Sequence, residues 1–232
     1  MKMTVSSRFL MVVVSIFIIF TTYNLISSKA ASPQVLLSWE ATSSYVPADY
    51  PGKALPSPLS PVIVKVGVFQ DGKMVDLSSY TIRWFLDEYS SSQGKGVTSF
   101  TIPPALRTNK DSYKIRVELL DYDPRAVLSK AVSIPIISPK VVINGGKNAK
   151  YVSFGDNSFE AIPFYFNISQ KTQLRYSWTA GNKFLGEGVS GVLKLIVKNN
   201  LKKGDKLEMT VVAKSSDNKL EQATAKNTYI IE

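Results

Sequence analysis

Neither cysteine nor histidine occurs among the 232 residues of this chain, which narrows the chemistry that its side chains can perform. Disulfide bonds, thiolate nucleophiles, imidazole bases and the usual zinc ligands are excluded. What remains is a pair of carboxylates acting on a glycan, or a serine paired with a lysine. Any catalytic site would therefore be built from carboxylates, hydroxyls and amines.

Two stretches match the spacing of a serine–lysine dyad, S-x-x-K. They run from Ser92 to Lys95 and from Ser216 to Lys219, and the second also contains the sequence S-D-N. Both fall in turns rich in glycine or asparagine between expected strands, whereas this chemistry needs the serine at the start of a buried helix. We therefore predict no catalytic residue and a protein that is not an enzyme.

Two further stretches suggest ligand binding. Asp121 and Asp123 follow a strand and could hold calcium at a loop between sheets or form a plain turn, and both interpretations stay open. The stretch from Ser90 to Gly96 suggests a phosphate cradle, but a strand pattern follows it instead of a helix, which favours a flexible hairpin loop. We name no metal ligand and no cofactor-binding residue.

A β pattern that occurs twice must position these residues. The run from Tyr80 to Trp84 precedes Gly94-Lys95-Gly96-Val97, and the run from Leu174 to Trp178 precedes Gly186-Glu187-Gly188-Val189. Alternation places both tryptophans on the inner face of a strand, which predicts two core anchors. The alternating residues Tyr113, Ile115, Val117 and Leu119 recur 94 positions later as Leu207, Met209, Val211 and Ala213.

The other alternating segments also predict strands, so the expected fold class is all-β. Strands are expected from Pro33 to Ala41, Pro61 to Phe69, Val127 to Ile137, Phe154 to Ile168, Leu193 to Val197 and Thr228 to Ile231. In the fourth of these, Phe164, Phe166 and Ile168 should share one face. Five prolines between residues 45 and 61 predict an extended crossover segment. The expected domains are residues 34–143 and 144–232.

The N-terminus has the features of an export signal. Lys2 and Arg8 precede an apolar run over residues 9–20, and residues 9–27 together are just long enough to span a bilayer. Ser28-Lys29-Ala30 offers a cleavage site, so residues 1–30 are either a cleaved signal peptide or an uncleaved anchor. In both cases the N-terminus stays inside and the remainder is exported. An exported chain without cysteine favours a bacterial or archaeal envelope.

The tryptophan-bearing strands resemble those of the immunoglobulin-like sandwich, in which a buried tryptophan packs between two sheets. Tyr176-Ser177-Trp178 and Ile82-Arg83-Trp84 are also similar to the strand that opens the core motif of polycystic-kidney-disease-type repeats in bacterial surface proteins. The resemblance covers residues 34–232 and implies tandem β-sandwich domains that bind or space rather than catalyse.

These observations predict a membrane-anchored or exported protein that uses two sandwiches for adhesion, assembly or scaffolding, with a protein or a cell-envelope polymer as partner. The alternative is a carbohydrate- or peptidoglycan-binding module with Tyr45, Tyr50 or Tyr89 in an aromatic platform; a carboxylate-dependent glycan hydrolase is less favoured. The lysines between residues 194 and 206 suggest a solvated strand edge, so no nucleic-acid partner is expected.

Overall fold

The computed structural model describes residues 32–104, 110–146, 150–198 and 201–232. The predicted membrane segment at residues 9–27 and the predicted cleavage site at Ser28-Lys29-Ala30 lie outside these ranges. Among the described residues, no helix is long and apolar enough to cross a membrane. The described residues divide into two compact units, one formed by residues 32–34 and 68–75 and the other lying within residues 35–67 and 76–232.

In the described residues the regular structure is β-strand, apart from the single turn η1 (Lys171–Gln173). The first eight strands are β1 (Gln34–Ala41), β2 (Val62–Gln70), β3 (Lys73–Met74), β4 (Thr81–Leu86), β5 (Tyr89–Lys95), β6 (Ser99–Ile102), β7 (Ser112–Asp123) and β8 (Ala126–Pro135). The next eight are β9 (Lys140–Gly145), β10 (Tyr151–Val152), β11 (Gly155–Phe164), β12 (Leu174–Ala180), β13 (Lys183–Gly188), β14 (Val192–Val197), β15 (Lys206–Ser215) and β16 (Gln222–Ile231). The predicted all-β class is confirmed.

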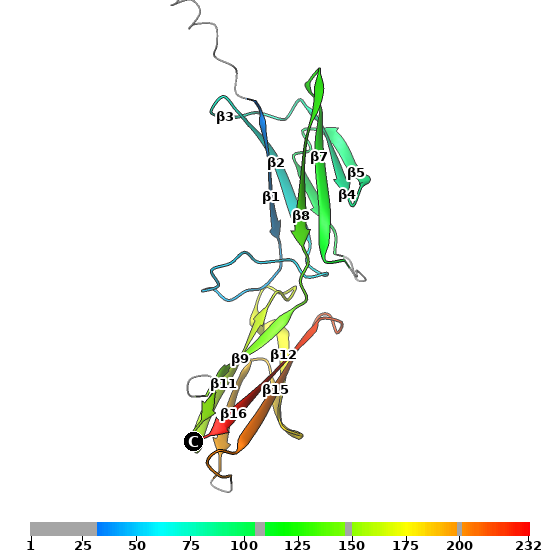
Figure 1. The fold of residues 1–232 in the computed structure, drawn as a ribbon. Helices are drawn as coiled ribbons and strands as arrows, with labels where there is room; N and C mark the ends of the chain where they lie inside the picture. The colour runs from blue at the N-terminus through cyan, green and yellow to red at the C-terminus, as the bar shows by residue number, and fades with distance from the viewer. Residues whose placement is uncertain (1–31, 105–109, 147–149, 199–200) are drawn as a thin grey trace, which may run out of the picture. The chain divides into compact units, whose positions relative to one another are not determined.

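Strands β1 to β8 form the first sandwich (Figure 1). One sheet has the order β1-β2-β3, with β6 also paired to β2, and the other has the order β5-β4-β7-β8. Trp84 of β4 is fully buried and stacks on Phe100 of β6 with ring centroids 5.8 Å apart, which joins the two sheets. The indole Nε1 donates to the Val97 carbonyl over 2.8 Å, so the buried polar group is satisfied.

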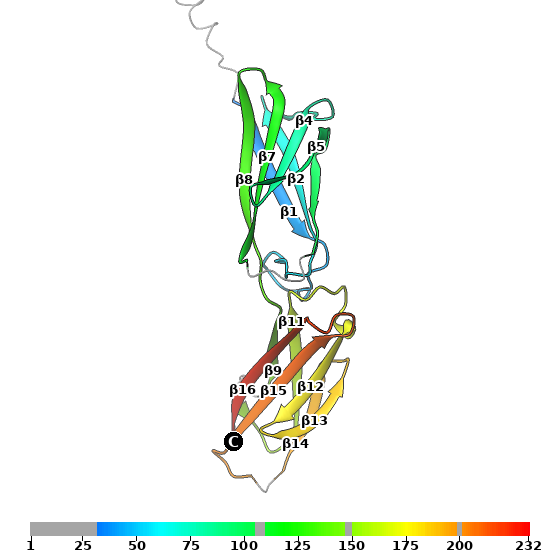
Figure 2. The same cartoon turned by 90° about the vertical axis from the view of Figure 1, so that its right-hand side faces the viewer.

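Strands β9 to β16 form the second sandwich, with sheets β14-β11-β9 and β10-β16-β15-β12-β13 (Figure 2). Phe159 of β11 and Tyr229 of β16 meet across its core with ring centroids 5.2 Å apart. Tyr176 and Trp178 lie in the same buried cluster, so the second predicted anchor is confirmed. The strand that follows the tryptophan strand, β5 in the first sandwich and β13 in the second, lies at one edge of its sheet.

The strand order of both sandwiches is immunoglobulin-like. In each, an antiparallel sheet places the tryptophan strand between its hairpin partner and the long strand that follows, giving β5-β4-β7-β8 and β13-β12-β15-β16. The facing sheet contains β1, β2, β3 and β6 in the first sandwich and β9, β11 and β14 in the second. The duplicated sequence pattern therefore corresponds to a duplicated strand arrangement.

Two expectations about local structure are wrong. The stretch from Ser90 to Gly96 is not a flexible loop, because β5 occupies most of it and the chain reverses earlier, at Asp87 and Glu88. These two residues have φ values of 50° and 72°, the positive φ that two-residue hairpin turns demand. The hairpin is therefore tighter than its glycines suggested.

The second error concerns Phe164, Phe166 and Ile168, which do not share one strand face. Strand β11 ends at Phe164, and Tyr165 has a φ of 63°, which turns the chain. Phe166 and Ile168 are buried beyond this turn, whereas Phe164 is only half-buried. A positive φ at a tyrosine is set by tertiary contacts and has no signal in the alternation.

The predicted proline-rich crossover is confirmed, since the residues between β1 and β2 form no strand beyond the isolated bridge of Ser44 with Asn167. The Tyr45 N–H donates to the Phe166 carbonyl, and the Tyr165 N–H donates to the Tyr45 carbonyl. Backbone pairing thus holds this segment against the turn that follows β11.

A buried carboxylate lies in the same region. Glu221 is 3% exposed, and its Oε1 accepts hydrogen bonds from the Asn167 N–H at 2.7 Å and from Ser57 Oγ at 3.3 Å. Ser57 and Ser60 are themselves buried and their hydroxyls lie 3.0 Å apart. The segment between β1 and β2 is therefore linked through polar side chains to the β15–β16 hairpin.

Candidate binding face

The structure places one S-x-x-K match on strand β5 and the other in the β15–β16 turn. Ser92 lies opposite Trp84, and Lys95 lies opposite Thr81, so the two side chains fall on opposite faces of β5. Ser216 and Lys219 are both exposed in the β15–β16 turn, where nothing desolvates an amine. Neither pair has the geometry of a dyad.

Asp121 and Asp123 point to different partners. Asp121 accepts hydrogen bonds from the Thr81 N–H at 2.7 Å and from Thr81 Oγ1 at 2.9 Å. Asp123 accepts from the Arg125 N–H at 2.9 Å and from Arg125 Nε at 3.1 Å. These bonds lower the pKa of both carboxyls. Among the described residues, no group of three or more acidic side chains converges as metal ligands.

The three tyrosines proposed for an aromatic platform do not gather in one place. Tyr89 begins β5 and is 79% exposed. Tyr45 packs against the core of the second sandwich, and the hydroxyl of Tyr50 lies 2.6 Å from that of Tyr165. Tyr45 and Tyr50 therefore serve packing, and Tyr89 stands apart from them.

A set of side chains with mutual polar contacts lies on the outer face of the sheet β5-β4-β7-β8. Arg83 of β4 and Arg116 of β7 both contact Glu118, Arg83 at 3.8 Å and Arg116 by a hydrogen bond. Arg83 Nε also donates to Gln93 of β5 over 2.7 Å. The Arg116 guanidinium lies over the ring of Phe85, 3.8 Å from its centroid, which is a cation–π geometry. We call these five residues the arginine ladder.

The strand register explains why these side chains meet. Arg83 lies opposite Glu118 and Phe85 lies opposite Arg116 in the β4–β7 pairing, so each pair shares one face. Trp84 between them points inward to the core. Burial of the tryptophan on one face therefore fixes the arginine ladder on the other.

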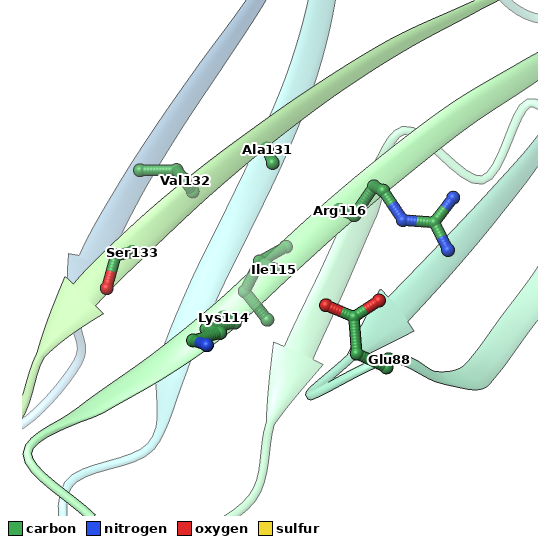
Figure 3. Close-up of a pocket in the computed structure, with 7 residues that line it drawn as sticks. All are labelled: Glu88, Lys114, Ile115, Arg116, Ala131, Val132 and Ser133. Carbon is green, nitrogen blue, oxygen red and sulfur yellow. The ribbon is translucent and has the colours of Figure 1, made fainter.

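A hollow of about 310 Å³ adjoins the arginine ladder (Figure 3). Lys114, Arg116 and Glu88 line one side, and the small residues Ala131 and Ser133 of β8 line the other. Figure 3 shows the Glu88 carboxylate rising from the β4–β5 turn on the side of β7 where the Arg116 guanidinium lies. The small side chains of β8 leave Lys114 open toward the sheet edge, whereas the Arg116 guanidinium lies on the β4 side of β7, over Phe85.

The β4–β5 turn that carries Glu88 is held by its neighbour Asp87. The Asp87 carboxylate accepts from Lys110 Nζ at 2.6 Å and from the Lys114 N–H at 3.1 Å. Burial acts to raise the pKa of Asp87, but these hydrogen bonds and the two nearby lysine charges outweigh it, and the pKa is lowered. Asp87 thus stays ionised and anchors the turn that carries Glu88.

The sequence contains a signal for this face in its strand alternation, outside any motif. The residues that alternate with the buried tryptophan and with the buried residues of β7 are Arg83, Lys114, Arg116 and Glu118. Their cross-strand alignment depends on register, which the sequence pattern leaves open.

No protein-family model matches the chain, and no curated protein matches it. The solved structures with a similar fold include the three N-terminal domains of the bacteriophage RB49 Highly Immunogenic Outer Capsid protein, with 16% identity, a TM-score of 0.45 and coverage of 86% of this chain. The chain spans 59% of the length of that phage structure.

Two other similar structures are the fibronectin(III)-like modules of Clostridium thermocellum CbhA and the ectodomain of mouse nectin-like molecule 4. The first has 12% identity and a TM-score of 0.31, covering 85% of this chain and 93% of that one. The second has 15% identity and a TM-score of 0.33, covering 86% of this chain and 63% of that one. The fold assignment rests on the strand order, and the site must supply the function.

Proposed function

We propose that this chain is a non-enzymatic binding protein that holds a protein partner on the outer face of β5-β4-β7-β8, in adhesion, assembly or scaffolding. The observation that carries the proposal is the arginine ladder, in which Arg116 is held between Phe85 and Glu118 beside an open hollow. Arginine and aromatic side chains dominate the energetics of protein interfaces. Side chains already fixed in place lose little entropy on binding.

The placement of the other reactive residues supports a binding role over catalysis. Ser92 and Lys95 lie on opposite faces of β5, Ser216 and Lys219 are exposed in a turn, and Asp121 and Asp123 are hydrogen-bonded to separate residues. The division into domains 34–143 and 144–232 is part of the same proposal. So are the export of both domains and a membrane anchor at residues 9–27, which Lys2, Arg8 and the apolar run support.

Photo-crosslinking in the cells that produce the full chain tests this proposal. A photoreactive amino acid in place of Gln93, the member of the arginine ladder on β5, should give a discrete cross-linked protein, and Arg116→Ala should reduce its yield at least tenfold. The same amino acid at Phe184 of β13, an exposed position in the other sandwich, is the control. Cross-linking at Gln93 that Arg116→Ala leaves unchanged would contradict a role for this face.

An activity screen complements this experiment. The purified full chain should not turn over glycans or acyl esters. Turnover that a single Asp or Glu substitution abolishes would show that the chain is a hydrolase.

A further inference from the structure

Strand β8 is an exposed edge of the sheet that carries the arginine ladder. It forms the last position in the order β5-β4-β7-β8, and most of its ten side chains are exposed. An edge strand presents unpaired backbone N–H and C=O groups that can pair with another chain. The edge of β8 is thus a physically available docking position.

The second sandwich shows how the end of such an edge strand is covered. Its corresponding strand, β16, is extended by β10, which pairs with it in parallel at Ile230 and Ile231. The Ile230 N–H donates to the Lys150 carbonyl over 2.9 Å. In the first sandwich Pro56 takes the corresponding place, since its carbonyl accepts the Ile137 N–H over 2.9 Å, and among the described residues no strand pairs with β8 on this side.

The register shows which part of β8 is open. Pro135 lies opposite Ser112 in the first sandwich, as Ile230 lies opposite Lys206 in the second, and Ser112 and Lys206 are 94 positions apart. Pro135 has no N–H, so the bond that Ile230 makes to β10 cannot form there. Backbone groups alternate in direction along a strand, so those of Ser129, Ala131 and Ser133 face the open edge with Pro135.

We propose that the β8 edge between residues 128 and 134 binds an extended, acidic segment of the partner protein as an added β-strand. This inference rests on the proposed function and names the class of partner that the face takes. Main-chain hydrogen bonds would supply affinity, and the side chains of the added strand would supply specificity.

The charges near the edge select an acidic segment. Lys130 stands in the middle of β8 opposite Val117, and Lys114 lies one strand further in on the other face of the sheet, opposite the small residue Ser133. Neighbouring strands are about 4.8 Å apart, so a glutamate on the added strand could reach across a small β8 side chain into the hollow. Its carboxylate would meet the extended side chain of Lys114, which lies opposite Ser133.

The same charges disfavour a second copy of this chain as the occupant. The chain has a formal net charge of +10, and pairing two β8 edges would bring two positive faces together. Lys130 and Pro135 also protect the edge against unselective pairing, since lysine and proline are common guards of edge strands. Lys130 would repel a basic strand but attract the carboxylates of an acidic one.

A peptide titration tests the proposal on the full chain in neutral detergent micelles. The probes are a capped nine-residue peptide of alternating threonine and glutamate and its counterpart with lysine for glutamate, each followed by fluorescence anisotropy. The glutamate peptide should bind, and the lysine peptide should bind at least tenfold more weakly. Equal binding of the two peptides, or no binding of the glutamate peptide, would overturn the proposal.

Two variants separate strand addition from simple charge attraction. Ala131→Pro removes one N–H at the open edge without changing the charge, and it should weaken binding of the glutamate peptide at least tenfold. Lys130→Glu should do the same, whereas Lys194→Glu on the edge strand β14 makes the same charge change elsewhere and should leave binding within about twofold. Binding that is lost in Lys130→Glu but kept in Ala131→Pro would show charge attraction without strand addition.

Hydrogen exchange on the unmodified chain gives a readout that does not depend on a variant folding. The glutamate peptide should slow amide exchange at Ser129, Ala131 and Ser133 and leave residues 192–197 of β14 unchanged. Absence of this protection at saturating peptide would contradict an added strand.

The cross-link at Gln93 distinguishes failure of this inference from failure of the proposed function. A cross-link that Arg116→Ala removes but Ala131→Pro leaves intact would keep the binding face and reject strand addition. A cross-link that neither variant affects would reject both.

Discussion

At the scale of single residues, the two tryptophans have matching roles in the two sandwiches. Trp84 is fully buried and Trp178 is 3% exposed. We expect Trp84→Ala and Trp178→Ala each to lower the free energy of unfolding by about 3–5 kcal/mol, the usual cost of emptying a buried aromatic site. Urea denaturation of the full chain measures this.

Trp39 provides the control for this pair of substitutions. Trp39 is only half-buried, with Lys53 Nζ 3.5 Å from the centre of its ring. Trp39→Ala should therefore lower the free energy of unfolding clearly less than the two core substitutions do. An unchanged unfolding free energy in both core variants would contradict their role as anchors of the two sandwiches.

Glu221 makes stability depend on pH. Burial raises its pKa by more than the hydrogen bonds from Asn167 and Ser57 lower it. A carboxyl whose pKa rises on folding stabilises the native state below its unfolded pKa, and that contribution is lost as pH rises through the folded value. The unfolding free energy of the wild type should therefore fall relative to that of Glu221→Gln as the pH rises above about 4.3, the pKa of an unperturbed glutamate.

Glu187 gives a control of opposite sign. Hydrogen bonds from Arg175 and Ser177 lower its pKa, so its contribution is present above the unfolded pKa and is lost as pH falls. Chemical denaturation of both glutamine variants over the same pH series makes the comparison. If the difference in unfolding free energy between the wild type and Glu221→Gln were the same at every pH, the pKa of Glu221 would be the same in the folded and unfolded states.

At the scale of elements, the entry into β14 depends on one glycine. Gly191 has a φ of 70°, and a Cβ there would lie 3.2 Å from the Ala161 carbonyl oxygen and 3.3 Å from the Tyr176 ring. Its own carbonyl accepts the Ala161 N–H over 2.8 Å. We expect Gly191→Ala to destabilise the protein by about 1–3 kcal/mol, the cost of holding a non-glycine residue in this backbone region.

Gly188 of β13 is the matched control for Gly191. A Cβ at Gly188 meets nothing within 4 Å, and its φ is not positive. Gly188→Ala should therefore change the thermal midpoint little, or raise it slightly through reduced entropy of the unfolded chain. Equal effects of the two substitutions would contradict the strain argument.

At the scale of the whole molecule, the direction of export remains a prediction from Lys2, Arg8 and residues 9–27. Positive residues flanking an apolar segment stay on the cytoplasmic side. A reporter that is active only outside the cytoplasm, fused after Glu232, should be active in cells. Replacing Lys2 and Arg8 with glutamate should reduce that activity, and activity of a cytoplasm-only reporter at the same position would contradict the predicted orientation.

The sequence by itself determined the elements whose side chains alternate strictly. Val62, Val64, Ile82 and Val117 are buried as the period of two requires, and the 94-residue repeat corresponds to β7 and β15. Local pattern was sufficient here because burial of one face imposes the same period on any strand, whatever its partners are.

Tertiary structure alone decided the turns and the binding face. The positive φ values at Asp87, Glu88 and Tyr165 are held by contacts with distant segments, such as the bonds from Lys110 and Lys114 to Asp87. The arginine ladder likewise needs the β4–β7 register, because a shift by one residue would pair its side chains with buried ones. Register arises from the packing of whole sheets, so the sequence pattern supplied the outward-facing residues without their alignment.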